Sequence, residues 1–100
     1  MNYRSRTDIS AQILESAVGG STRTKIQYMT FLSYSHLDEY LDLLVQNGLL
    51  EYTAALHTFI TTSKGDRFLK LYNQIVECIE PELETASQAS YRSIGISNSE

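Results

Sequence analysis

The stretch that decides the fold runs from Thr22 to Leu50 and reads TRTKIQYMTFLSYSHLDEYLDLLVQNGLL. Ser33 can accept a hydrogen bond from an unpaired backbone N–H, as residues that begin helices do. After it, apolar side chains recur at steps of three and four residues, which gives one apolar helical face; these are Leu37, Tyr40, Leu41 and Leu44. Gly48 can adopt the left-handed conformation and end this helix. Together with a shorter helix that begins at Ser21 or Thr22, the stretch predicts a helix-turn-helix.

The residues before this stretch predict one more helix. Thr7 or Asp8 can cap a helix over Ile9–Val18, and the Gly19-Gly20 pair stops it. The inward side chains expected of the first two helices are Ile9, Ile13, Leu14, Ile26 and Met29.

After Gly48 the apolar period changes to that of a β-hairpin. Leu49, Leu50 and Tyr52 begin one strand, and the β-branched and aromatic residues of 58–61 form a second. A hairpin directly after a helix-turn-helix is a wing. The fold class expected is therefore mainly α with a small β-hairpin, a winged helix-turn-helix followed by a long C-terminal helix.

Thr62 is expected to cap that last helix, roughly Lys64–Glu80, and Pro81 is expected to break or kink it at its end. The helix carries more apolar surface than one small core needs, which favours a homodimer through it. The interface expected comprises Phe68, Tyr72, Ile75, Val76 and Ile79. The domain organisation predicted is a winged helix-turn-helix over 1–63, a dimerisation helix over 64–84 and a serine-rich disordered tail over 85–100.

Composition limits the classes of protein that fit. The chain has 100 residues and a net charge of −4, which is unevenly spread. Residues 1–35 carry four Lys or Arg against two acids, residues 36–52 carry four acids and no Lys or Arg, and residues 53–76 carry three basic residues against one acid. The lone Cys78 excludes an internal disulfide and is expected to be a quiet, buried thiol. With no 18-residue apolar run and no signal-like N-terminus, a soluble, cytoplasmic protein is expected.

Four segments together resemble the archaeal winged-helix DNA-binding family of small proteins, which includes chromatin-associated dimers. They are RSRTDISAQIL at Arg4–Leu14, GGSTRTKIQY at Gly19–Tyr28, LSYSHLDEYLDLLVQNGLLEY at Leu32–Tyr52 and TTSKGDRFL at Thr61–Leu69. The resemblance implies a DNA-binding protein, nucleoid-associated, that dimerises through its C-terminal helix as an antiparallel coiled coil. The chain departs from the family's basic or amide side chains at Ser35, Asp38 and Glu39.

The second helix of a helix-turn-helix places its first turn in the major groove of DNA. The side chains expected to reach bases or phosphates from it are Tyr34, Ser35, His36, Glu39 and Tyr40. Phosphate contacts are expected from Arg4, Arg6, Arg23, Lys25, Lys64 and Arg67. His57, at the wing tip, is expected to contribute little, because the wing has no Lys or Arg.

Other functions are weighed against DNA binding. A protein-interaction adaptor is the main alternative, favoured by the acidic third helix and the net charge. Enzyme activity is not expected, because there is no nucleophile elbow, P-loop or dinucleotide motif. His36, Glu39 and His57 lack a further ligand at a natural spacing, so no metal, cofactor or small-molecule ligand is expected. The tyrosines suggest base stacking, but core-edge positions explain Tyr28, Tyr40, Tyr52 and Tyr72.

Overall fold

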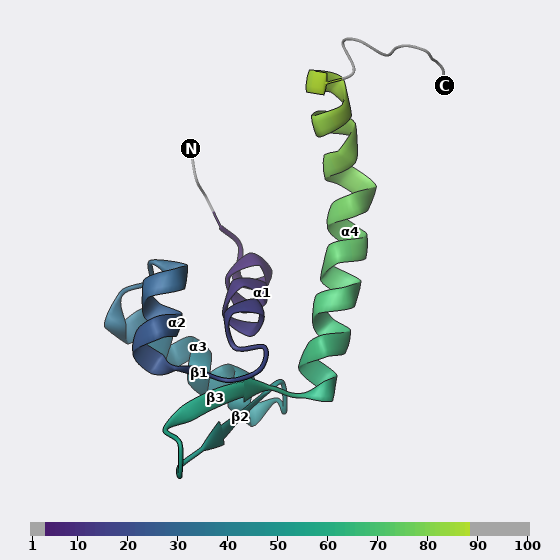
Figure 1. Ribbon diagram of the computed structural model, residues 1–100. Coiled ribbons are helices and arrows are strands. Elements are labelled where there is room, and N and C mark those ends of the chain that lie inside the picture. Colours follow the sequence, from purple (N-terminus) through teal and green to yellow (C-terminus); the bar gives the residue numbers. More distant parts are fainter. Residues whose placement is uncertain (1–3, 89–100) are drawn as a thin grey trace. The chain divides into compact units, whose positions relative to one another are not determined.

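The computed structural model describes residues 4–88, with side chains through Ile79. Its elements are α1 (Arg6–Ser16), β1 (Ser21–Thr22), α2 (Arg23–Thr30), α3 (Tyr34–Gln46), β2 (Leu50–Thr53), β3 (Thr58–Thr61) and α4 (Ser63–Gln88) (Figure 1). The chain forms two compact units, Met1–Lys70 and Leu71–Glu100. The predicted fold class, mainly α with a small hairpin after a helix-turn-helix, is confirmed.

Three of the predicted helix starts are confirmed by side-chain caps. The hydroxyl of Ser33 accepts a hydrogen bond from the His36 amide at 3.2 Å, and Thr22 accepts one from the Lys25 amide at 3.2 Å. At the start of α4, the Thr62 hydroxyl accepts from the Gly65 amide at 3.1 Å. Each cap satisfies an N–H that has no partner within its own helix.

The predicted start of α1 is wrong. Ser5 is the cap, and it forms a reciprocal pair with Asp8, in which each side chain accepts a backbone N–H of the other at 3.0 Å. Asp8 therefore lies within the first turn and does not precede it, as in a capping box. Thr7 is also inside the helix, which ends at Ser16 and not at Val18.

The sheet has three antiparallel strands in the order β1-β3-β2. Leu50 pairs with Thr61 and Tyr52 with Phe59, so the predicted hairpin is confirmed. β1, in which Ser21 pairs with Phe59, was not predicted. It is two residues long, and its partner lies far away in the sequence, so no local pattern marks it.

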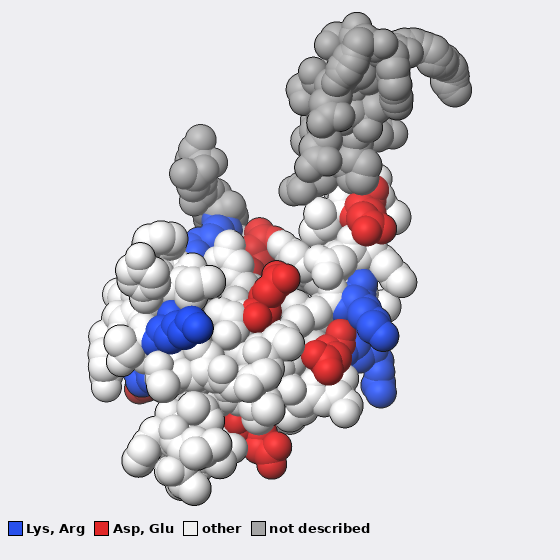
Figure 2. All heavy atoms as spheres, in the orientation of Figure 1, with Lys and Arg blue, Asp and Glu red and all other residues white. Residues whose placement is uncertain are grey.

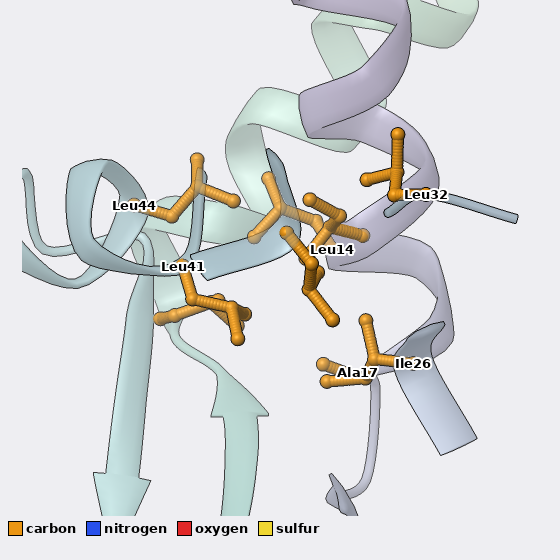
Figure 3. Packing of buried hydrophobic residues seen from close by; sticks show 9 residues of the cluster. Leu14, Ala17, Ile26, Leu32, Leu41 and Leu44 are labelled. Atoms are coloured by element: carbon orange, nitrogen blue, oxygen red, sulfur yellow. The ribbon is translucent and has the colours of Figure 1, made fainter. Parts of the chain in front are cut away.

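The core lies between α1, α2, α3 and the base of the hairpin (Figure 3), where apolar side chains from different helices point toward one another. Its buried members are Ile13, Leu14, Ala17, Ile26, Leu32, Leu37, Leu41, Leu44 and Leu50, with Ile9 and Tyr40 packed at the edge. The inward position predicted for Met29 is wrong, because its side chain is 54% exposed. On the short helix α2, Ile26 and Thr30 already fill the buried positions.

The predicted end of α4 at Glu80 is also wrong, since the helix continues through Pro81 to Gln88. A proline removes one helical hydrogen bond, but the turns on either side of it can still form. Residues 85–88 of the predicted tail belong to this helix, and the rest of the tail lies outside the described residues. Cys78 is exposed, contrary to expectation. The described part of its unit is a single helix, which provides no core to bury it.

Gly65 lets the first turn of α4 approach the backbone that leads into β2. A Cβ atom at this position would lie 2.5 Å from the Leu49 carbonyl oxygen and 2.5 Å from Cγ2 of Thr61. Only glycine leaves room for this approach. One turn later, Phe68 and Leu69 pack against the core, so the glycine contact helps to place them.

We predict that Gly65→Ala destabilises the protein although alanine is the better helix former. Overpacking of this kind costs about 1–3 kcal/mol, which should appear as a lower midpoint in thermal or urea unfolding followed by circular dichroism. The control is Ser63→Ala, at an exposed position in the same turn. An unchanged or raised midpoint for Gly65→Ala would show that the contact is not tight.

Candidate functional site

The burial of one side of α3 determines which of its side chains face solvent. Leu37, Leu41 and Leu44 are at most 3% exposed. At 100° per residue, the opposite side of the helix carries Ser35, Glu39, Asp42 and Gln46, and all four are exposed. The predicted recognition helix therefore presents its first turns to solvent, but two of the four outward side chains are carboxylates.

Arg23 lies beside the first turn of α3. Its Nη2 donates to the Tyr34 carbonyl oxygen at 3.0 Å and to Oδ1 of Asp38 at 3.2 Å. Its guanidinium lies over the Tyr34 ring, 3.7 Å from the ring centroid. The Asp38 side chain is 63% exposed, so water screens this ion pair and it adds little stability. The contacts together fix a cation and an aromatic ring at the start of α3.

Arg6 lies on the other side of the same helix. It lines a cleft of about 340 Å³ between α1 and α3 together with Ile9, His36, Glu39, Tyr40 and Leu43. The structure thus brings two predicted cations to the N-terminal half of α3, Arg6 on one flank and Arg23 on the other. Three of the predicted α3 residues, His36, Glu39 and Tyr40, share the cleft with Arg6.

The other predicted cations lie elsewhere. Arg4 donates to the Thr30 carbonyl oxygen at 2.7 Å, at the end of α2, and to Gln12 at 2.6 Å. Lys64 donates to the Asn47 carbonyl oxygen at 2.8 Å, at the C-terminal end of α3. Arg67 is exposed one turn further along α4. Because a 13-residue helix is about 20 Å long, Lys64 and Arg67 do not gather at the start of α3.

The electrostatic surface that results is mixed. On the face drawn in Figure 2, basic side chains lie in several separate places, in some of them beside one another or beside acidic side chains, with uncharged atoms between these places. Of the six basic residues expected to contact phosphate, Arg6 and Arg23 therefore lie beside the N-terminal half of α3, and the set as a whole does not gather there. Lys25 is exposed on α2, two residues after Arg23 in the chain.

The wing adds a second groove, which the sequence did not predict. Asp38, Leu41, Asp42 and Val45 of α3 face Tyr52 and Phe59 of the hairpin across about 270 Å³. His57, at the wing tip, adopts the left-handed conformation with φ 53°, and its Nδ1 lies 3.3 Å from the Tyr52 hydroxyl. Residues 50–62 contain no Lys or Arg, so the charges of this groove are acidic.

The exposure of two aromatic residues on the helix-turn-helix was also missed. Tyr28 is 75% exposed and Phe31 is 83% exposed. The core-edge position predicted for Tyr28 is therefore wrong. Ile26 and Thr30 are buried, and Tyr28 lies two residues from each of them, so helix geometry turns Tyr28 to the opposite side of α2. The helical period of the sequence therefore indicates that Tyr28 is exposed.

Among the side chains that the structure describes, through Ile79, no three of His, Cys, Asp or Glu lie close enough together to hold a metal ion. Among the helices described, none has the length and apolar character that crossing a membrane requires.

The geometry agrees with what comparison with known proteins finds. A family model described as winged helix-turn-helix matches residues 3–80. Among solved structures, the chain is similar to the crystal structure of Sso10a-2, a DNA-binding protein from Sulfolobus solfataricus, with a TM-score of 0.72 and 21% identity. That alignment covers 91% of this chain and 100% of the other. Comparison with curated proteins gave no match.

At 21% identity the structural likeness concerns the fold alone. The family model, however, spans more than half of the sequence. It includes α1, the helix-turn-helix, the hairpin and most of α4. The predicted resemblance is confirmed at this level, and the chain belongs to the winged helix-turn-helix family.

Proposed function

We propose that this protein binds double-stranded DNA by placing the first turns of α3 in the major groove. The observation that carries the proposal is the position of Arg23. Its guanidinium is held against the Tyr34 ring and carbonyl at the start of α3. There it can contact a phosphate at the groove edge while Ser35 and His36 face the bases.

The similar protein from Sulfolobus solfataricus is described as DNA-binding, which supports the same class of partner here. In the mode proposed, Arg6 and Arg23, on the two flanks of α3, contact phosphates on the two sides of the groove, which is about 12 Å wide, and Lys25 adds a phosphate contact. Lys64 and Arg67, near the other end of α3, contact phosphates further along the groove. The role is a binding role without catalysis, in transcription regulation or in the architecture of the nucleoid.

The acidic side chains of α3 limit this affinity. Glu39 and Asp42 face outward and repel phosphate, although a carboxylate can accept a hydrogen bond from cytosine N4. Affinity therefore depends strongly on the few cations around the helix. The same carboxylates favour the alternative function, an adaptor that binds a basic protein segment, for which the groove with Asp38 and Asp42 is the specific support.

We further propose that two copies associate through α4. Leu71, Ile75 and Ile79 lie at four-residue steps and are 54%, 59% and 62% exposed. Tyr72 and Val76 are half-buried, whereas Phe68 packs against the core of its own chain. A row of apolar side chains on a 26-residue helix is the pattern of a helix that pairs with another. Two copies would then contact two DNA half-sites.

We predict that duplex binding weakens steeply with salt. Each phosphate contact contributes a slope of about −0.9 to the plot of log affinity against log salt concentration. About three to five contacts per protomer should therefore give a slope of about −3 to −5. Fluorescence anisotropy with a labelled duplex over a salt series measures this slope. A flat response would contradict the proposed phosphate contacts.

Removal of the outward carboxylates should strengthen duplex binding. For the double variant Glu39→Gln and Asp42→Asn, we expect the affinity for duplex DNA at low salt to rise roughly fivefold. The gain comes from removing the repulsion between two carboxylates and phosphates at a distance of about 8 Å in water. The matched control is Glu15→Gln with Glu77→Gln, which changes the net charge equally at exposed sites on α1 and α4. If both double variants gain equally, only net charge matters and α3 does not face the DNA.

Ile75→Asp should shift the protein from dimer to monomer, because a carboxylate in an apolar seam is costly to bury. Sedimentation velocity over a concentration series measures the change. Gln74→Asp adds the same charge at the neighbouring exposed position and should leave the dimer intact. A dimer that persists in Ile75→Asp would place the interface elsewhere.

A further inference from the structure

α2 carries an aromatic surface that the proposed contact between α3 and duplex DNA does not use. Tyr28 and Phe31 are 75% and 83% exposed. Their ring centroids are 6.5 Å apart, with the ring planes tilted by 39°. Two large neighbouring rings open to water are an unfavourable arrangement unless they contact a partner.

Phe31 has a backbone conformation that phenylalanine disfavours. Phe31 ends α2 with φ 58° and ψ 30°, the left-handed conformation, which bulky side chains rarely adopt. Its amide donates to the Gln27 carbonyl oxygen at 2.9 Å, and the Gln27 side chain donates to the Leu32 carbonyl oxygen at 3.2 Å. Leu32 is buried. Glycine or asparagine would fit this position without strain, so the exposed ring is a candidate for function.

Two basic residues adjoin the segment that carries the two rings. Lys25 precedes Tyr28 by three residues, which makes them neighbours on the surface of α2. At the other end, Arg4 donates to the Thr30 carbonyl oxygen, next to Phe31 in the chain. α2 contains no Asp or Glu. We refer to Lys25, Tyr28 and Phe31, with Arg4, as the α2 ridge.

We propose that the α2 ridge binds single-stranded nucleic acid. Bases stack on the rings of Tyr28 and Phe31, and the cations at the two ends of the ridge contact the phosphates. Aromatic rings beside cations form the platforms on which single strands bind, since every base has a face that can stack. A duplex keeps these faces covered by its own base pairs, so the rings distinguish single strands from duplex DNA.

The charge of the ridge decides between this partner and an apolar protein surface. A protein partner would gain from the two rings, but it would have to cover Lys25 and Arg4 with acids of its own. A single strand supplies both base faces and phosphates at a regular spacing. The positive charge without acids on α2 therefore favours a polyanion.

The test compares the full chain with the double variant Tyr28→Ser and Phe31→Ser. Anisotropy with a labelled oligothymidine at low salt should show binding to the wild type and at least about tenfold weaker binding to the variant, given the loss of two stacked bases. Affinity for a duplex should change less than about twofold. Tyrosine fluorescence of the wild type should fall as the single strand is added, since stacking quenches it, and the variant should show less of this quenching.

A control variant carries Leu56→Ser and Val18→Ser, two exposed apolar side chains outside α2. It should keep the affinity of the wild type for the single strand, and circular dichroism should show that all variants are folded. A separate variant, Ser35→Ala with His36→Ala, should lose affinity for the duplex and keep affinity for the single strand. Failure of the proposed duplex mode would thus appear in a different measurement from failure of the ridge.

Three results would overturn the proposal. The first is that the ridge variant binds oligothymidine as tightly as the wild type does. The second is that the ridge variant loses single strand and duplex equally, which would make the ridge part of the duplex surface. The third is that the ridge variant no longer self-associates in sedimentation but binds the single strand as the wild type does. The ridge would then be a contact between protein copies.

Discussion

The burial of the leucines of α3 is the constraint on which the rest of the structure depends. Leu37, Leu41 and Leu44 fill the centre of a small core to which α1, α2 and the base of the hairpin also contribute. Because a helix is rigid, this burial fixes the opposite side of α3 toward solvent. The identity of the exposed side chains is therefore decided by which side is buried. The caps at Ser33 and Thr22 set where the two helices of the helix-turn-helix begin.

The charges that α3 presents to solvent are less favourable to DNA binding than the fold is. α3 contributes Asp38, Glu39 and Asp42 and no Lys or Arg. The positive charge that a phosphate would meet comes from other elements, Arg6 at the start of α1 and Arg23 at the start of α2. Local field and not net charge decides association with nucleic acid, so a chain of net charge −4 can bind DNA where these two cations flank the helix. Arg23 is also ion-paired with Asp38, so part of its charge offsets that acid and only the remainder attracts a phosphate.

The sequence predicted most of the local structure, because it is encoded locally. The apolar period of α3, its serine cap and the β-branched run of β3 each predict their element from a few neighbouring residues. β1 was missed because two residues have no period and their pairing partner is distant. Pro81 was given too much weight, since one lost hydrogen bond did not end a helix of 26 residues. The glycine contact at Gly65 depends on the approach of α4 to Leu49, which no local pattern reveals.

The candidate site was predictable only in part for the same reason. That α3 presents Ser35, His36 and Glu39 follows from its period. Which cations accompany them depends on tertiary positions, and Lys64 is held at the far end of α3 by the Asn47 carbonyl. The core-edge position predicted for Tyr28 assumes that it lies on an apolar face, although the period of α2 turns it outward. Cys78 and Met29 show the same error, in which an apolar side chain is assumed to be buried without a surface to cover it.

The central claim is that the solvent-facing first turns of α3 are the surface that meets duplex DNA. Nuclear magnetic resonance of the ¹⁵N-labelled full chain, titrated with a short duplex, tests it most directly. The account predicts that the largest changes in amide chemical shift fall on Ser35, His36 and Glu39, with changes at the side-chain N–H groups of Arg6 and Arg23. Changes that leave α3 untouched and fall instead on the hairpin or on α4 would contradict it.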